Sequence, residues 1–175
     1  MLEVEVKAKI KNLEEFKKRL KETNAKFLKT EIQEDLYFNH PCRDFAETDE
    51  ALRIRKINDK TFLTYKGKRL DAETKTREEI EINCGEEISE ILTLLGFKTV
   101  ANVQKDRKEY EFEKLHICVD KVEQLGNFVE IEGKNLTDKD KIFEILKFFG
   151  IEKGETLTLS YMELLMEKIK CGIKK

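Results

Sequence analysis

The opening stretch of this chain limits how the rest of it can fold. Apolar and charged residues alternate without a break from Leu2 to Ile10, and this period of two predicts a β-strand with one apolar and one charged face. Glu3 and Glu5 lie two positions apart on the charged face, a spacing that suits a hard divalent ion such as Mg²⁺ or Mn²⁺. A strand whose charged face simply meets water gives the same pattern. The later strands have to decide between these two interpretations.

The same alternation returns in most of the later strand candidates, where the charges on the polar faces come in pairs of one sign. Examples are Arg53 with Arg55, Lys105 with Arg107, and Glu130 with Glu132. In an open sheet these faces would meet water. In a closed barrel they would point into a lumen that holds water and a ligand, because so many ions cannot be buried dry. Pairs of one sign favour the barrel, because a merely soluble surface mixes signs, and they suit a metal bound to a polyphosphate.

Length and composition set the class of protein. A chain of 175 residues can build one domain with a sizeable core, so we expect a single domain over residues 1–175. Lys and Arg total 34 against 36 Asp and Glu, and a net charge of −2 gives no electrostatic case for nucleic acid or a membrane as partner. Four widely spaced cysteines argue against a zinc site or a disulfide framework. Without an apolar run long enough to cross a bilayer, the expected location is the reducing cytoplasm.

Cap and turn signals predict an α+β fold that is mainly β, with about eight mostly antiparallel strands and a few peripheral helices. A capping box at Asn12 starts a helix that runs to about Glu22. Further helices are expected at 86–95, up to Phe149, and at 161–170, the first two of these followed by glycine. The remaining strands are expected at 32–38, 51–57, 61–66, 76–83, 103–113, 117–122 and 128–132, and the loop 39–50 shows no periodicity.

An ordered set of motifs resembles the CYTH domain of the triphosphate tunnel metalloenzymes, and more narrowly its class IV adenylyl cyclase (CyaB-like) branch. The set begins with an ExExK pattern at Glu3-Val4-Glu5-Val6-Lys7 and continues with residues 33–38, 51–55, 64–67, 77–81, 103–107 and 120–132. ExExK alone is a weak signal, whereas the ordered set spans most of the chain, and the helix that follows Ser160 is also similar. The resemblance implies a closed eight-stranded antiparallel β-barrel, the triphosphate tunnel, with peripheral helices.

Carried over by position, the resemblance also implies roles for the charged residues. The expected ligands of the metal, two Mg²⁺ or Mn²⁺ ions, are Glu3, Glu5, Asp120, Glu130 and Glu132. The residues expected to hold the triphosphate are Lys7, Arg53, Arg55, Lys66, Lys105 and Arg107. Lys75, Arg77, Glu79 and Glu81 share one face of their strand and are expected to line the tunnel in less defined roles.

The resemblance allows three functions. An adenylate cyclase would let the 3′-hydroxyl of ATP attack the α-phosphorus and release pyrophosphate. A triphosphatase would use the same groups on inorganic triphosphate, thiamine triphosphate or a nucleoside triphosphate, and a binding module would hold a nucleotide or polyphosphate without turnover. The segments 39–45 and 48–50 resemble the cyclase branch and favour the first function. The expected partners are ATP or another triphosphate and, as an option, a second copy of the chain in a homodimer.

Overall fold

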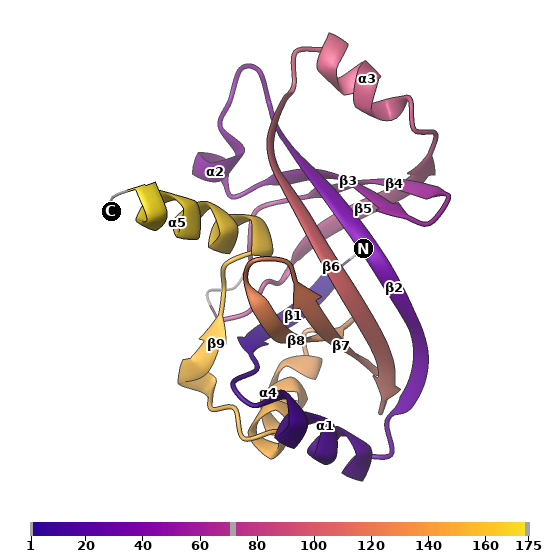
Figure 1. Ribbon diagram of the computed structural model, residues 1–175, viewed down its shortest axis with the longest axis vertical. Helices are drawn as coiled ribbons and strands as arrows, with labels where there is room; N and C mark the ends of the chain where they lie inside the picture. The colour runs from indigo at the N-terminus through magenta and orange to yellow at the C-terminus, as the bar shows by residue number, and fades with distance from the viewer. Residues whose placement is uncertain (1, 71–72, 174–175) are drawn as a thin grey trace.

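The computed structural model describes residues 2–70 and 73–173, and within them the chain forms nine strands, five α-helices and one short 3₁₀ helix (Figure 1). The strands are β1 (Leu2–Lys9), β2 (Lys26–Asn39), β3 (Ala51–Ile57), β4 (Lys60–Lys66), β5 (Arg77–Cys84), β6 (Lys98–Phe112), β7 (Leu115–Val122), β8 (Gly126–Gly133) and β9 (Thr156–Leu157). The helices are α1 (Leu13–Glu22), α2 (Phe45–Thr48), α3 (Ile88–Leu94), α4 (Asp138–Phe148) and α5 (Tyr161–Ile173), with η1 (Lys153–Glu155) as the 3₁₀ helix. The fold is thus α+β and mainly β, as expected.

The strands form one antiparallel sheet in the order β5-β4-β3-β2-β6-β7-β8-β1-β9. The register between β1 and β8 places Glu5 opposite Glu132 and Lys7 opposite Glu130. Because directly opposite residues in an antiparallel pair share one face of the sheet, their side chains come together. Carboxylates and an ammonium group from two strands therefore meet on one side.

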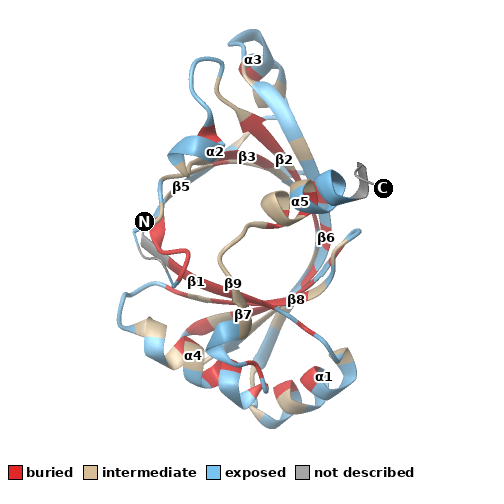
Figure 2. Cartoon of the chain, turned by 90° about the vertical axis from the view of Figure 1, so that its left-hand side faces the viewer, coloured by how far each residue is buried: buried red, intermediate tan, exposed pale blue. Residues whose placement is uncertain are grey.

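The sheet curls into a ring, but no full-length ladder closes it into a barrel (Figure 2). The strands on either side of the opening, β1 and β5, pair at only two positions, Leu2 with Glu78 and Glu3 with Arg77. The expectation of a closed barrel is therefore wrong. The expected number of eight strands is also wrong for the described residues, because β9 adds a ninth.

The reason for the incomplete closure lies in the edge of β1 that faces β5. Beyond Glu3 this edge has other partners: the carbonyl of Glu5 accepts the backbone N–H of Lys75, and Lys7 and Ala8 pair with β9. Since the backbone groups along this edge already have these partners, they cannot extend a ladder to β5.

The apolar face of β1 points away from the interior of the ring and packs against α1 and α4. Val6 is 2% exposed and belongs to a core that includes Phe16 of α1 and Ile142 of α4. Burying each such side chain contributes about 1.5–3 kcal/mol to stability. The charged face, which carries Glu5 and Lys7, is therefore turned inward, where both residues are buried. Of the two interpretations of the opening strand, the one with solvated charges is excluded for Glu5 and Lys7, whereas Lys9 at the end of the same face is exposed.

Other boundaries differ from the sequence expectation in ways that tertiary pairing explains. β2 begins at Lys26 and β6 at Lys98, each several residues before its expected start, because the two long strands pair with one another along most of their length. The segment expected to be an irregular loop contains α2, which is capped by the Asp44 side chain through the N–H of Ala46. Gly96 and Gly150 follow α3 and α4 with φ of +88° and +77°, as the glycines predict. Among the described helices, none has the length and apolar character needed to span a bilayer.

Candidate active site

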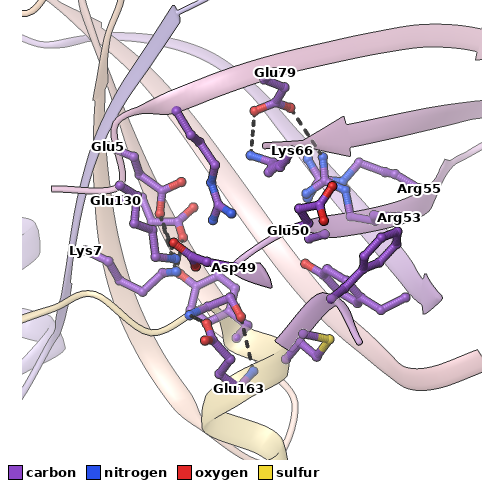
Figure 3. Close-up of a pocket in the computed structure, with 18 of the residues that line it drawn as sticks. Glu5, Lys7, Asp49, Glu50, Arg53, Arg55, Lys66, Glu79, Glu130 and Glu163 are labelled. Atoms are coloured by element: carbon purple, nitrogen blue, oxygen red, sulfur yellow. Dashed lines mark hydrogen bonds and ion pairs between the residues drawn. The ribbon is translucent and has the colours of Figure 1, made fainter. Parts of the chain in front are cut away.

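A cavity of about 260 Å³ lies inside the ring, bounded by the inner faces of the strands, the segment around α2 and the first turn of α5 (Figure 3). All the residues expected to hold the triphosphate line it, namely Lys7, Arg53, Arg55, Lys66, Lys105 and Arg107, and so do Lys75, Arg77, Glu79 and Glu81. Among the expected metal ligands, Glu5, Glu130 and Glu132 line the cavity. The side chain of Glu3 lies outside the described residues.

Three carboxylates form a group that could hold a metal ion. One oxygen each from Glu5, Glu130 and Glu132 lies within 4.8 Å of the others. Within the described structure, Oε1 of Glu5 is buried and accepts no hydrogen bond, although the ammonium groups of Lys7 and Lys75 are each 3.4 Å away. Carboxylate oxygens are the ligands that Mg²⁺ and Mn²⁺ prefer. The donor set therefore fits a divalent ion.

Neighbouring cations keep these carboxylates ionised. Burial and the charge of Glu130 raise the pKa of Glu5, but Lys75, Lys7 and Lys66 outweigh them and lower it to about 2. Burial likewise raises the pKa of Glu130, yet its cationic neighbours hold that pKa well below the usual value. Both groups are thus negatively charged at neutral pH, as a metal ligand must be.

Two lysines, Lys7 and Lys75, lie next to these carboxylates, and their pKa values are shifted in opposite directions. Lys7 is 1% exposed, and its Nζ lies 2.7 Å from Oε1 of Glu130. Burial lowers the pKa of Lys7, but Glu130 and Glu5 outweigh it and raise that pKa above the usual value. For Lys75 burial prevails and lowers the pKa to about 7, although Glu5 acts in the opposite direction. Lys7 is therefore a permanent cation of the site.

A second cluster, on the inner faces of β2, β3 and β4, contains two more of the expected phosphate-binding residues. Nε and Nη2 of Arg55 donate to the two carboxylate oxygens of Asp35 at 2.6 and 2.7 Å. Arg53 lies 3.7 Å from the same carboxylate and donates to the hydroxyl of Thr64 at 3.2 Å. Asp35 is 1% exposed, so its charge is stabilised by the two arginines rather than by water.

Of the expected metal ligands whose side chains the structure describes, only Asp120 lies outside the group formed by Glu5, Glu130 and Glu132. It lies behind the cavity lining with no exposed surface, and its two oxygens accept Nε and Nη2 of Arg107 at 2.8 and 2.7 Å. Nζ of Lys105 is 3.4 Å away and the hydroxyl of Tyr161 is 2.9 Å away. These partners occupy both oxygens of the carboxylate.

Sequence reasoning left several lining residues unassigned. Asp49 and Glu50, which follow α2, and Glu163, in the first turn of α5, enter the cavity from outside the strands (Figure 3). Tyr161, the first residue of α5, also lines the cavity. Alternation along strands cannot reveal such residues. The capping box at Ser160 marked the start of α5 in the sequence, but it carried no signal that this turn faces the cavity.

The charge balance of the cavity indicates what kind of ligand it suits. Its lining contains eight basic and eight acidic side chains. A bare polyanion would meet as much repulsion as attraction in such a lining. A polyphosphate accompanied by divalent ions is complementary to it, because carboxylates hold the metal while Lys and Arg hold phosphate oxygens.

Comparison with known proteins agrees with this geometry. The CYTH domain family model matches residues 1–160. A protein of Methanocaldococcus jannaschii named as a candidate adenylate cyclase is 44% identical over 172 residues, which cover 94% of this chain and 98% of the relative.

Solved structures extend the comparison to the fold. The PH1819 protein of Pyrococcus horikoshii OT3 is 43% identical, with a TM-score of 0.85 over 95% of this chain and 99% of its own. A Hippeastrum protein described as a candidate adenylyl cyclase with a dominant triphosphatase activity has a TM-score of 0.73 over 95% of this chain and 96% of its own. At 22% identity, the second likeness is evidence of the fold alone.

Proposed function

Because the chain belongs to the CYTH domain family, we propose that it is a metal-dependent enzyme acting on a triphosphate, and that it converts ATP to cyclic AMP and pyrophosphate. The observation that carries the proposal is a single cavity in which Glu5, Glu130 and Glu132 lie beside the buried ammonium group of Lys7. The metal held by the carboxylates and the phosphates held by the cations would then be parts of one bound complex of metal and triphosphate. The adenylate cyclase name of the Methanocaldococcus relative supports ATP as the triphosphate.

In the proposed reaction, the 3′-hydroxyl oxygen of ATP forms a bond to the α-phosphorus, and the bond between that phosphorus and the oxygen bridging to the β-phosphorus breaks. Pyrophosphate leaves with the bridging oxygen, and the hydroxyl proton passes to solvent. Mg²⁺ or Mn²⁺ held by Glu5, Glu130 and Glu132 would neutralise phosphate charge and lower the pKa of the attacking hydroxyl. We propose two ions, with Glu3 as a further ligand.

The protein's own part in this reaction is positioning. Lys7, Lys66 and Lys105 offer point charges, and Arg53, Arg55 and Arg107 offer planar groups that can grip two phosphate oxygens at once. Holding the triphosphate in one conformation keeps the 3′-hydroxyl close to the α-phosphorus, which removes much of the entropic barrier.

A triphosphatase is the second candidate. Here the oxygen of a water molecule would bond to the terminal phosphorus of inorganic triphosphate, thiamine triphosphate or a nucleoside triphosphate, while the bond to the bridging oxygen breaks. Orthophosphate and the corresponding diphosphate would leave, the diphosphate with the bridging oxygen, and a proton of the water would pass to solvent. The Hippeastrum protein, whose fold is similar, is described as having a dominant triphosphatase activity, so the fold is compatible with this reaction. The same cavity lining would serve both reactions. A module that binds a nucleotide or polyphosphate without turnover is the third candidate.

Product analysis distinguishes the three candidates. The purified protein is incubated with Mg²⁺ or Mn²⁺ and, in parallel, ATP, inorganic triphosphate and thiamine triphosphate. Cyclic AMP together with pyrophosphate is the expected result. Orthophosphate without cyclic AMP would establish a triphosphatase. Binding without any product would favour the module that binds a nucleotide or polyphosphate without turnover.

A matched pair of variants ties the activity to the cavity. Glu130→Gln removes a charge from the carboxylate group, whereas Glu144→Gln removes one from the exposed surface of α4. Loss of turnover in the first variant only would assign the activity to the cavity. Equal activity in both variants would exclude the proposed metal site.

The remaining proposals concern the setting of the enzyme. We propose one CYTH domain over residues 1–175 and a cytoplasmic location, which is consistent with four free cysteines, all within the described part of the chain. A homodimer stays a proposal, and the mass of the protein in solution tests it.

A further inference from the structure

Tyr161 is held rigidly in the wall of the cavity. It is the first residue of α5 and is 4% exposed. A reciprocal cap fixes the start of the helix: Oγ of Ser160 accepts the N–H of Glu163 at 3.1 Å, and the Glu163 carboxylate accepts the N–H of Ser160 at 2.6 Å. The rings of Tyr161 and Phe128 pack edge to face at a centroid distance of 5.1 Å. The orientation of the side chain is therefore determined by packing on several sides.

The hydroxyl of Tyr161 is connected to Arg107 by hydrogen bonds through the carboxylate of Asp120. It donates to Oδ2 of Asp120 at 2.9 Å, and the two oxygens of Asp120 accept two nitrogens of Arg107. A planar guanidinium held by two parallel hydrogen bonds has a fixed direction. The third nitrogen of Arg107, Nη1, then lies 3.2 Å from Oε1 of Glu132, at the carboxylate group.

The ring of Tyr161 contacts two lysines. Nζ of Lys7 lies 4.0 Å from the ring centroid, and Nζ of Lys105 lies 5.0 Å from it. The negative face of an aromatic ring attracts an ammonium group, most strongly where water is excluded. Both lysines are buried, so water does not weaken their contacts with the ring.

We propose that Tyr161 is a positioning residue of this site, which holds Lys7 and Lys105 with its ring and Arg107, through Asp120, with its hydroxyl. Asp120 is then the anchor of an arginine and not a ligand of the metal. The inference rests on the proposed function, because its ligand is a triphosphate. A flexible polyanion binds more tightly to cations that are already in place, since less ordering accompanies binding.

Two substitutions separate the two parts of the role. Tyr161→Phe keeps the ring and removes the hydroxyl, whereas Tyr161→Leu removes both. The dissociation constant of inorganic tripolyphosphate is measured by calorimetry with Mg²⁺ present. We expect it to rise about fivefold in Tyr161→Phe and about thirtyfold in Tyr161→Leu. For any triphosphate that the wild-type protein turns over, KM should rise in the same order.

The controls are Tyr110→Phe and Tyr110→Leu, at a tyrosine of β6 that packs beside Phe27 away from the cavity. These two variants should leave the dissociation constant unchanged even where they lower the melting temperature, which is recorded for every variant. A purely structural role for Tyr161 would produce the same result as these controls. A dissociation constant that is about sixfold lower in Tyr161→Phe than in Tyr161→Leu supports the contribution of the ring.

The outcomes separate the inference from the function on which it rests. Wild-type binding together with an unchanged dissociation constant in Tyr161→Leu overturns the inference alone. A wild-type protein that does not bind tripolyphosphate overturns the proposed function and the inference with it. If Tyr161→Leu does not fold, Tyr161→Phe decides, and an unchanged dissociation constant in that variant overturns the proposal.

Discussion

Asp35 and Arg55 form a two-pronged ion pair across β2 and β3, with both oxygens of the carboxylate engaged at 2.6 and 2.7 Å. The carboxylate is buried, and Nη1 of Arg53 lies 3.7 Å from its Oδ2. Because Arg53 and Arg55 both line the cavity, this aspartate sets the position of two proposed phosphate-binding groups.

Asp35→Asn should therefore destabilise the protein. Removing one partner of a buried pair leaves uncompensated charge, which costs about 3–5 kcal/mol. Urea denaturation at neutral pH measures the change in the free energy of unfolding. Asp59→Asn, in the exposed turn between β3 and β4, is the control and should stay within about 0.5 kcal/mol of wild type. Similar values for the two variants would show that the ion pair contributes nothing measurable.

The contribution of Asp35 should also depend on pH. Burial raises the pKa of its carboxyl, but Arg55 and Arg53 outweigh burial and hold the pKa well below the ordinary value of about 3.9. A carboxyl whose pKa is lower in the folded state adds stability above its unfolded pKa and loses it as the pH falls. The difference in unfolding free energy between wild type and Asp35→Asn should thus be constant from about pH 7 to about pH 5.

Below about pH 4 that difference should shrink, because the unfolded wild-type chain then takes up a proton at Asp35. Urea titrations of both proteins across this range give the comparison directly. A difference that grows toward acid pH would contradict the direction of the pKa shift.

The carboxylate group predicts different costs for two of its members. Glu130 is buried against Lys7 and Arg107, whereas the side chain of Glu132 is 25% exposed. Glu130→Gln should lower the melting temperature by about 10 °C, because two buried cations lose a partner. Glu132→Gln should lower it by no more than about 2 °C.

Turnover should nevertheless fall by at least about 100-fold in both variants, since each removes a proposed ligand of the metal. Melting curves and initial rates at several Mn²⁺ concentrations measure the two effects separately. Full activity of Glu132→Gln at low Mn²⁺ would remove that residue from the ligand set.

The sequence was sufficient to divide β1 into an apolar and a charged face, because a period of two leaves only one set of side chains for the core. That the charged face points inward was favoured only by the like-charged pairs of the later strands. Val6 and Glu5 occupy the expected faces. The glycines that end α3 and α4 were equally predictable, since a positive φ favours glycine whatever the surroundings. Such local rules depend only on neighbouring residues.

The partners of Asp35 and Tyr161 could not be predicted in this way. Alternation places Asp35 on the inner face of β2, but its pairing with Arg55 depends on the register of the ladder between β2 and β3. Tyr161 contacts Asp120 of β7 from α5, a helix that follows the last strand of the chain. The failed closure of the barrel has the same origin, because Lys75 and β9 compete with β5 for one edge of β1.

The equal numbers of acidic and basic groups in the cavity predict that metal and polyphosphate bind together. Tripolyphosphate with Mg²⁺, at about 100 times its dissociation constant, should raise the unfolding free energy by about 2.7 kcal/mol and the melting temperature by about 5–10 °C. Tripolyphosphate with EDTA should raise the melting temperature by less than about 2 °C, because the carboxylates then repel the ligand as strongly as the cations attract it. Glu132→Gln should weaken the metal-dependent part of the shift. Thermal denaturation with sulfate as the control anion tests this, and equal shifts with and without Mg²⁺ would mean that the cations alone bind the phosphates.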